Sequence, residues 1–157
     1  MSKSNAIKLY IENIFKNSRF AVLATEGEGQ PHASFIAITP MEGYRKLIFA
    51  TYRDTRKYSN LVLNPRVAML IESGTGRGPE QQDSFVLTAF GQLEEIRAEE
   101  YDAVFMAHLN WHPDLYSFMH SEDCSLVQIK VNTYQVVRGI DDVEWWSIGD
   151  LVSPDSE

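Results

Sequence analysis

The stretch Thr51-Tyr52-Arg53-Asp54-Thr55-Arg56-Lys57 marks the point where a strand is expected to pass into a helix. Residues 47–50 before it, Leu-Ile-Phe-Ala, form a short apolar run typical of a strand. Asp54 or Thr55 can cap the helix that follows, because either side chain can accept a hydrogen bond from a free amide of the first turn. Asn64-Pro65 is a stop signal for that helix. The pattern predicts a strand, a polar turn and a short helix.

Two adjacent cations, Arg56 and Lys57, begin the expected helix. The first turn of a helix carries the positive end of the macrodipole, so a cation there costs up to about 1 kcal/mol. Helix-terminal amides combined with charged and hydroxyl donors are what a phosphate group requires. We therefore interpret this turn as an anion-binding site, with a solvated basic turn as the alternative.

The positive charge of the chain is concentrated around this turn. Fourteen Lys and Arg residues against 22 Asp and Glu residues give a net charge of −8. Residues 45–66 nevertheless hold six basic residues and one acid, a local net charge of +5. A nucleic acid needs a broad basic face, whereas one compact patch on an acidic protein suits a small anionic ligand. We therefore expect no nucleic-acid partner.

A length of 157 residues with 44% hydrophobic residues is sufficient for one domain with its own core. We expect a single domain over residues 1–157, with the tail after about residue 141 as a candidate extended segment.

No apolar run reaches the length of about 18 residues that a membrane-spanning helix needs, so no membrane partner is expected. Cys124 is the only cysteine, and the N-terminal residues lack a secretory signal, which favours a cytoplasmic location. Cys124 itself is interpreted as a small buried residue that begins a strand.

Hydrophobic periodicity predicts six strands with helices between them. Helical spacing is found over residues 4–17 and 101–109, with a shorter helical segment over 115–119. Strands are expected over residues 20–25, 31–38, 47–51, 67–72, 84–96 and from about 127, with a hairpin turn at 26–29 and a loop through Pro40 and Gly43. The alternation of apolar and polar residues in the last strand shifts by one residue near Thr133, which predicts a bulge or bend in that strand. The pattern favours a mainly β fold, a small six-stranded antiparallel barrel with added helices.

An ordered set of short motifs resembles the pyridoxamine 5'-phosphate oxidase-like, FMN-binding split-barrel family. The motifs are Gly29-Gln30-Pro31-His32, Phe49-Ala50-Thr51, Thr55-Arg56-Lys57 and Asn64-Pro65-Arg66-Val67. The match is good across residues 20–72 and only general over residues 84–139. The resemblance implies a six-stranded antiparallel split β-barrel that binds FMN.

The resemblance also implies the residues that contact FMN. Thr55, Arg56 and Lys57 would hold the phosphate, with a further hydroxyl from Thr51 and with Ala50 beside it at the end of the strand. Ser34, Phe35 and Ile36 would lie along the isoalloxazine ring, largely through backbone groups. Members of the family are homodimers with FMN at the interface, so residues near Ser84 and Phe85, or an aromatic residue of the tail, are expected to close the pocket of the partner chain.

The sequence departs from true pyridoxamine phosphate oxidases where those enzymes bind their substrate. Ser34 and Thr39 stand where they have Arg and Lys, and no Arg-x-His signature follows Val131. The resemblance therefore implies an FMN-dependent oxidoreductase that acts on an unidentified small molecule, with no catalytic side chain identified. The alternative is a non-catalytic module that binds or senses flavin or haem.

Two other groups of residues are candidate sites. His108, His112 and His120, with Asp123 and Cys124 nearby, could hold a metal only if three or four of them converged, and one of the histidines could be an axial ligand of haem. Packed or surface histidines are the favoured interpretation, and no metal is expected. Trp111, Trp145 and Trp146 could stack on a flavin, or could pack in the core or at a dimer interface.

Overall fold

The computed structural model describes residues 3–72, 86–139 and 142–151. Its strands are β1 (Phe20–Gly27), β2 (Gln30–Ala37), β3 (Thr39–Met41), β4 (Lys46–Tyr52), β5 (Arg66–Glu72), β6 (Val86–Glu94), β7 (Cys124–Gly139) and β8 (Asp142–Ser147). Its helices are α1 (Lys3–Asn17), α2 (Arg56–Leu63), α3 (Tyr101–Trp111), α4 (Tyr116–Met119) and α5 (Ile148–Leu151), with 3-10 turns η2 (Ala98–Glu100) and η3 (Pro113–Leu115).

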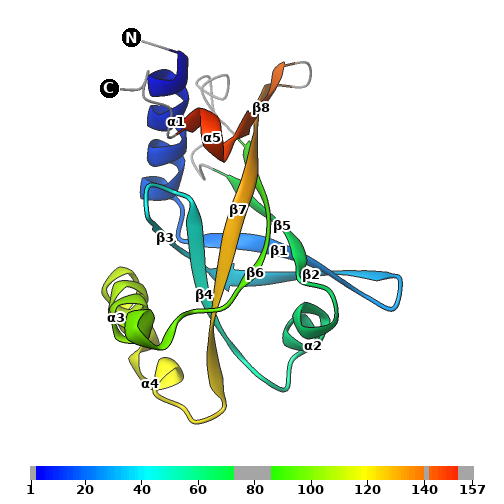
Figure 1. The fold of residues 1–157 in the computed structure, drawn as a ribbon, viewed down its shortest axis with the longest axis vertical. Helices are drawn as coiled ribbons and strands as arrows, with labels where there is room; N and C mark the ends of the chain where they lie inside the picture. Colours follow the sequence, from blue (N-terminus) through cyan, green and yellow to red (C-terminus); the bar gives the residue numbers. More distant parts are fainter. Residues whose placement is uncertain (1–2, 73–85, 140–141, 152–157) are drawn as a thin grey trace.

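The strands form one antiparallel sheet that curls into a split barrel (Figure 1). The strand order is β2-β1-β5-β6-β7-β4-β3, and β8 pairs with β7 outside this path. The two ends of the order, β2 and the β3–β4 hairpin, lie near each other without pairing, and this gap is the split. The predicted class, a mainly β antiparallel split barrel with helices, is confirmed.

The predicted number of strands is too low, because the described residues form eight. Residues 39–41 of the predicted loop form β3, which pairs with β4. Residues 142–147 of the tail form β8, which pairs with the second half of β7. A strand of three residues is too short to display an alternating pattern, so β3 could not be recognised without its partner.

The β1–β2 turn is tighter than predicted. Gly27 pairs with Gln30, so only Glu28 and Gly29 lie outside the ladder. Both have positive φ angles, 53° and 83°. Two positive φ angles define the type I′ turn that matches the twist of a two-residue hairpin.

The core fills the inside of the barrel and is closed by α1. Alternate residues of the strands point inward, as Leu47 and Phe49 do in β4, and both are fully buried. Helix α1 adds Ile11 and Ile14, which are at most 1% exposed and belong to the same cluster. The predicted amphipathic helix over residues 4–17 is therefore confirmed, and its apolar face covers one end of the barrel.

The predicted irregularity near Thr133 is a β-bulge in β7. Phe90 pairs with Thr133, but the next residue of β6, Gly91, pairs with Val131. Asn132 is therefore the extra residue, and beyond it the alternation of buried and exposed residues in β7 shifts by one position. A bulge increases local twist, which helps a long strand to curve around a barrel.

No helix within residues 3–72, 86–139 and 142–151 has the length and apolar composition needed to cross a bilayer.

Candidate functional site

A cavity of about 270 Å³ lies at the split, between β2 and the end of β4. The strands and the start of α2 form one wall, and residues from α3, η3 and α4 form the other. The lining residues are Phe20, Phe35, Ile36, Ala37, Ala50, Thr51, Tyr52, Thr55, Lys57, His108, Leu115 and Phe118. In the described part of the chain β2 pairs with β1 alone, so its other edge carries backbone groups without sheet partners.

Three polar side chains line the cavity, Thr51, Thr55 and Lys57, here called the anion cluster. Thr55 caps α2 as the sequence predicted, because its Oγ1 accepts a hydrogen bond from the Tyr58 amide at 3.3 Å. Thr51 Oγ1 lies 3.1 Å from Thr55 Oγ1, and Thr55 Oγ1 donates to the carbonyl oxygen of Tyr52 at 2.9 Å. The hydroxyl protons therefore have local acceptors, and an anion would bind by turning them toward itself.

Lys57 is the cation of this cluster. Its side chain is half-buried, and no carboxylate of the described residues pairs with it. An uncompensated ammonium group beside two hydroxyls and the first amides of a helix is the donor set that a phosphate prefers. The anion cluster is therefore suited to a phosphate or a similar small anion.

The position of α2 is held by a buried amide. Asn60 Nδ2 donates to Thr25 Oγ1 of β1 at 3.0 Å, and both side chains are at most 4% exposed. Gly27 allows this approach, because a Cβ atom at that position would overlap the Asn60 amide. The helix terminus that carries Thr55 and Lys57 is thus fixed against the β1–β2 hairpin.

The structure brings six of the ten predicted site residues to the cavity, namely Phe35, Ile36, Ala50, Thr51, Thr55 and Lys57. Arg56 and Ser34 do not line it. Arg56 is exposed to solvent, and the buried hydroxyl of Ser34 has no hydrogen-bond partner. Ser84 and Phe85 lie outside the described residues, as does the start of the strand predicted over residues 84–96.

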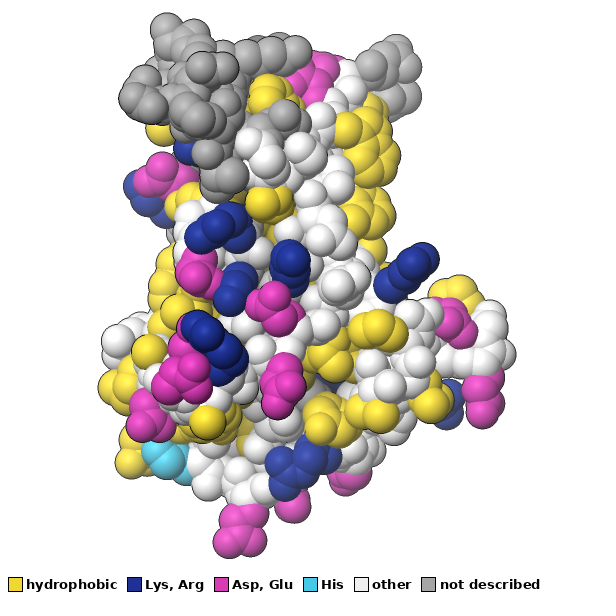
Figure 2. All heavy atoms as spheres, viewed as in Figure 1, with side chains coloured by type: hydrophobic (Ala, Val, Ile, Leu, Met, Phe, Trp, Pro, Cys, Tyr) yellow, Lys and Arg dark blue, Asp and Glu magenta, His cyan; other side chains and the backbone are white. Residues whose placement is uncertain are grey.

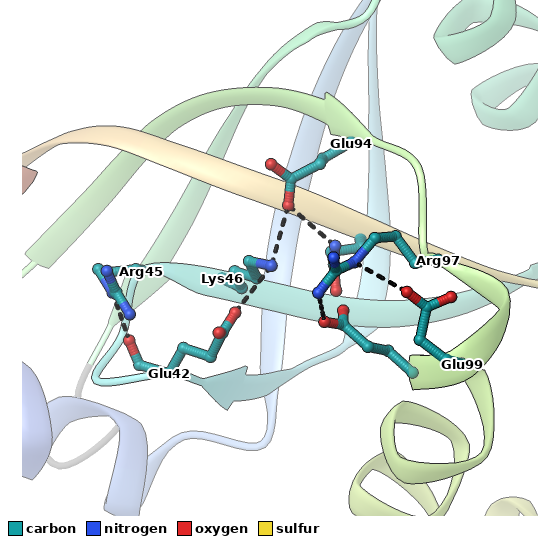
Figure 3. A network of polar contacts seen from close by, with 8 residues as sticks. Glu42, Arg45, Lys46, Glu94, Arg97 and Glu99 are labelled. Atoms are coloured by element: carbon teal, nitrogen blue, oxygen red, sulfur yellow. Dashed lines mark hydrogen bonds and ion pairs between the residues drawn. The ribbon is translucent and has the colours of Figure 1, made fainter.

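The predicted basic patch is dispersed rather than compact, and this part of the prediction is wrong. Lys46, the first residue of β4, pairs with Glu42 at 2.8 Å and with Glu94 at 3.2 Å (Figure 3). Lys46 and Thr51 are five residues apart on one strand, which separates them by about 17 Å. Arg53 donates to the carbonyl oxygens of Glu122 and Cys124.

Among the six basic residues of segment 45–66, only Lys57 lines the cavity. Cations and carboxylates are interspersed over the face shown in Figure 2, with no broad field of one sign. The positive charge at the site is therefore that of one lysine and a helix terminus.

Aromatic and apolar side chains also line the cavity. Phe20 and Phe35 stack with ring centroids 4.9 Å apart, and Leu115 and Phe118 face the same cavity from η3 and α4. Sequence reasoning missed all of these except Phe35. Phe20 could have been found from the hairpin, because it pairs with Ala37 beside the predicted flavin-contacting residues. Leu115 and Phe118 come from a distant part of the chain, where no local pattern indicates a site.

His108 and His112 form a buried pair on α3, with ring centroids 4.9 Å apart. His108 Nδ1 lies 2.8 Å from Thr39 Oγ1, and His112 Nε2 donates to the carbonyl oxygen of Ile38 at 2.7 Å. Burial, with a smaller effect of His112, lowers the pKa of His108 from 6.5 to about 4. Burial also lowers the pKa of His112. Both rings are packed and neutral at pH 7, in agreement with the favoured interpretation, but His108 in addition lines the cavity.

The other candidate groups lie away from the cavity. Trp146 is buried in the core, Trp145 stacks on Phe90 at 5.4 Å, and Trp111 is exposed on α3. No cluster of three His, Cys, Asp or Glu residues that could hold a metal is found in the described part of the chain. Cys124 is the first residue of β7 and is half-buried, and this burial raises the pKa of its thiol.

The cavity fits FMN by the chemistry of its donors. Thr51, Thr55 and Lys57 suit a phosphate, and the stacked Phe20 and Phe35 suit a planar ring. A cavity of about 270 Å³ lies just below the range of about 300–1,000 Å³ found for small-molecule sites.

Comparison with known proteins identifies the group to which the chain is similar. A protein of Schizosaccharomyces pombe named a pyridoxamine 5'-phosphate oxidase homologue is 21% identical, over 94% of each chain. The structure of a heme binding protein from Mycobacterium smegmatis superposes with a TM-score of 0.82 and 20% identity, over 96% of this chain but only 60% of that chain. General Stress Protein 26 from Bacillus anthracis superposes with a TM-score of 0.67 and 22% identity, over 90% of this chain and 98% of that one.

At these identities the two structures establish the fold alone. The model of the pyridoxamine 5'-phosphate oxidase family matches residues 9–138, which include every strand from β1 to β6 and all but the last residue of β7. The match thus spans the anion cluster, both walls of the cavity and the helix that carries His108. This chain belongs to the pyridoxamine 5'-phosphate oxidase family.

Proposed function

We propose that this protein binds FMN at the split of its barrel and acts as an oxidoreductase on an unidentified small molecule. The observation that carries the proposal is one cavity lined both by a hydroxyl and lysine cluster and by stacked aromatic rings. FMN has the matching parts, a phosphate joined by a short chain to a planar, uncharged ring.

Different parts of the chain would hold the phosphate and the ring of this cofactor. Thr51, Thr55 and Lys57 would bind the phosphate, and the free edge of β2 at residues 35–37 would offer backbone groups to the ring. When bound, FMN supplies the capacity to accept and donate a hydride, which no side chain possesses. Fixed backbone amides at this edge would stabilise negative charge there without reorganisation.

Replacing Lys57 by methionine is expected to weaken FMN binding by about 10- to 100-fold, the value of one charge-assisted hydrogen bond. Riboflavin lacks the phosphate, so its affinity should stay the same in this variant. Thr55→Ala should likewise affect FMN more than riboflavin. Quenching of flavin fluorescence during titration measures all of these affinities.

Arg56→Met is the matched control, because Arg56 precedes Lys57 on α2 but lies outside the cavity. Its effect on FMN affinity should be smaller than that of Lys57→Met. Failure of the unmodified protein to bind FMN, or equal FMN affinity in the unmodified and Lys57→Met proteins, would refute the proposed site.

We further propose that the functional unit is a homodimer with the cofactor at its interface. One row of outward-facing residues crosses the sheet from Phe35 through Val22, Leu70, Thr88 and Gln135 to Trp145. Phe35, Leu70 and Trp145 in this outer row are 67%, 44% and 58% exposed. Large apolar side chains in a row on a sheet face are typical of a protein interface. The row ends at Phe35, which also lines the cavity, so a second copy seated on it would enclose the site.

A charge placed in the outer row should dissociate the dimer. Leu70→Glu is expected to change the mass measured by light scattering from that of a dimer to that of a monomer, because the carboxylate would be buried without a partner. Met106→Glu on α3, where Met106 is 49% exposed, is the control and should leave the mass unchanged. A monomeric unmodified protein would contradict the proposal directly.

A second candidate function is a non-catalytic module that binds flavin or haem. It is supported by the similarity to a structure described as a heme binding protein and by the free Nε2 of His108 in the cavity wall. Haemin added in parallel with FMN distinguishes the cofactors, because ligation by a histidine gives a sharp Soret band that His108→Ala would abolish. A protein that binds FMN but is never reduced by NADH or NADPH, and transfers no electrons to any acceptor tried, would favour the non-catalytic module.

A further inference from the structure

His108 lines the cavity, and one of its ring nitrogens has no hydrogen-bond partner in the structure. Its side chain is fully buried, Nδ1 is occupied by Thr39, and Nε2 has no partner in the structure. Buried polar atoms are almost always paired, so a vacant one in the wall of a cavity indicates a partner that binds there. Leaving such an atom unpaired costs stability, which a hydrogen bond from a ligand atom would restore.

His112 does not explain the vacancy. Its Nδ1 is also without a partner, but the two rings do not hydrogen-bond to each other. His112 faces a different cavity, which it lines with Arg19 and Trp111, whereas His108 lines the cavity at the split. The two rings therefore line different cavities.

Thr39 makes His108 adaptable. The carbonyl oxygen of Ile38 can only accept, so it fixes the proton of His112 on Nε2. The Thr39 hydroxyl can either donate to or accept from His108 Nδ1, so rotation of this hydroxyl allows either tautomer. Nε2 of His108 can thus present a donor or an acceptor to the cavity without any change in net charge.

We propose that Nε2 of His108 hydrogen-bonds the uncharged ring portion of the ligand held at the split, and that His108 is a ligand-contacting residue in the same cavity as the anion cluster. The inference rests on the proposed function and adds a specificity element to it. Among the described lining residues of this cavity Lys57 is the one cation, so the wall formed by His108, Leu115 and Phe118 offers no site for a second phosphate. This wall therefore selects a neutral, planar group with one hydrogen-bonding atom.

A pair of amide variants tests the contact. In His108→Gln the amide reaches the position of Nε2, whereas in His108→Asn it reaches only the position of Nδ1 and can keep the bond to Thr39. We expect His108→Asn to bind both FMN and riboflavin about tenfold more weakly, the value of one hydrogen bond, and His108→Gln to stay within about threefold of the unmodified protein. Lys57→Met, by contrast, should weaken the binding of FMN alone.

A second measurement distinguishes a direct contact between His108 and the ligand from a merely structural role of His108. The ¹⁵N resonance of His108 Nε2 should shift when riboflavin is added, while the resonances of His112 stay in place. If the unmodified protein binds FMN, but His108→Asn binds it equally well or the Nε2 resonance does not move, the inference is wrong and the proposed function stands. Equal losses in the Asn and Gln variants would also refute it. A protein that binds no flavin at all would refute both.

Discussion

Replacing Gly91 by alanine is expected to lower the free energy of unfolding by about 3 kcal/mol, at the upper end of the cost of overpacking. Gly91 lies in β6 beside the bulge, where a Cβ atom would overlap the carbonyl oxygen of Lys130 and lie 3.0 Å from Cγ2 of Ile129. Ile129 is 1% exposed and belongs to the central strand β7, so neither neighbour can move without separating β6 from β7. Urea unfolding measures the loss, and the melting temperature should fall by about 6–12 °C.

Gly149→Ala is the matched control for this prediction. Gly149 is exposed in α5, and the nearest atom to an added Cβ is the Ser147 hydroxyl at 3.8 Å. Its stability should change by less than about 1 kcal/mol, the difference in helix propensity between the two residues. Equal stabilities of the two variants would show that β6 and β7 can separate at little cost.

The parts of the fold that could be predicted are those with a complete local pattern. The amphipathic stripe of α1 and the phase slip near Thr133 are both visible in a few consecutive residues, because burial on one face leaves a period in the sequence. The number of strands was not predictable in this way. β3 has only three residues, and it exists because β4 offers it a partner, which is a tertiary effect.

The site residues, too, could be predicted only where they belong to a local sequence pattern. Thr55 and Lys57 could be placed from the strand-to-helix junction alone, whereas Arg56 was assigned with them and lies outside the cavity. Successive residues of a helix point about 100° apart, so the side chains of Arg56 and Lys57 leave the helix in different directions. His108 was correctly expected to be packed, but its place in the cavity wall depends on how α3 docks against β3 and β4. No spacing along the chain contains that information.

Acidification from pH 7 to pH 5 is expected to lower the free energy of unfolding by about 2 kcal/mol through His108 alone. Burial, and the adjacent His112, lower the pKa of folded His108 to about 4, whereas the unfolded chain has the ordinary value of 6.5. The unfolded state therefore binds a proton at pH 5 that the folded state does not. The contribution of His108 is fully present above pH 6.5 and is lost as the pH falls toward 4, where the loss reaches about 3 kcal/mol. His112, whose pKa is also lowered by burial, acts in the same direction.

The glutamine variant isolates this effect, because the His108→Gln side chain does not titrate. Thr39 and His112 are the polar groups facing the ring, and the charges nearest the pair, Arg19 and Asp114, are bound to each other. The pKa of Asp114 is lowered by that bond, so the carboxylate stays charged over the whole range from pH 7 to pH 5. Urea unfolding at pH 7, 6 and 5 should therefore show the stability difference between unmodified protein and variant narrowing by about 2 kcal/mol. Parallel pH dependences would mean that the pKa of His108 is the same in the folded and unfolded states. Since His108 forms part of the cavity wall, the same narrowing would locate the acid sensitivity of the fold at its ligand site.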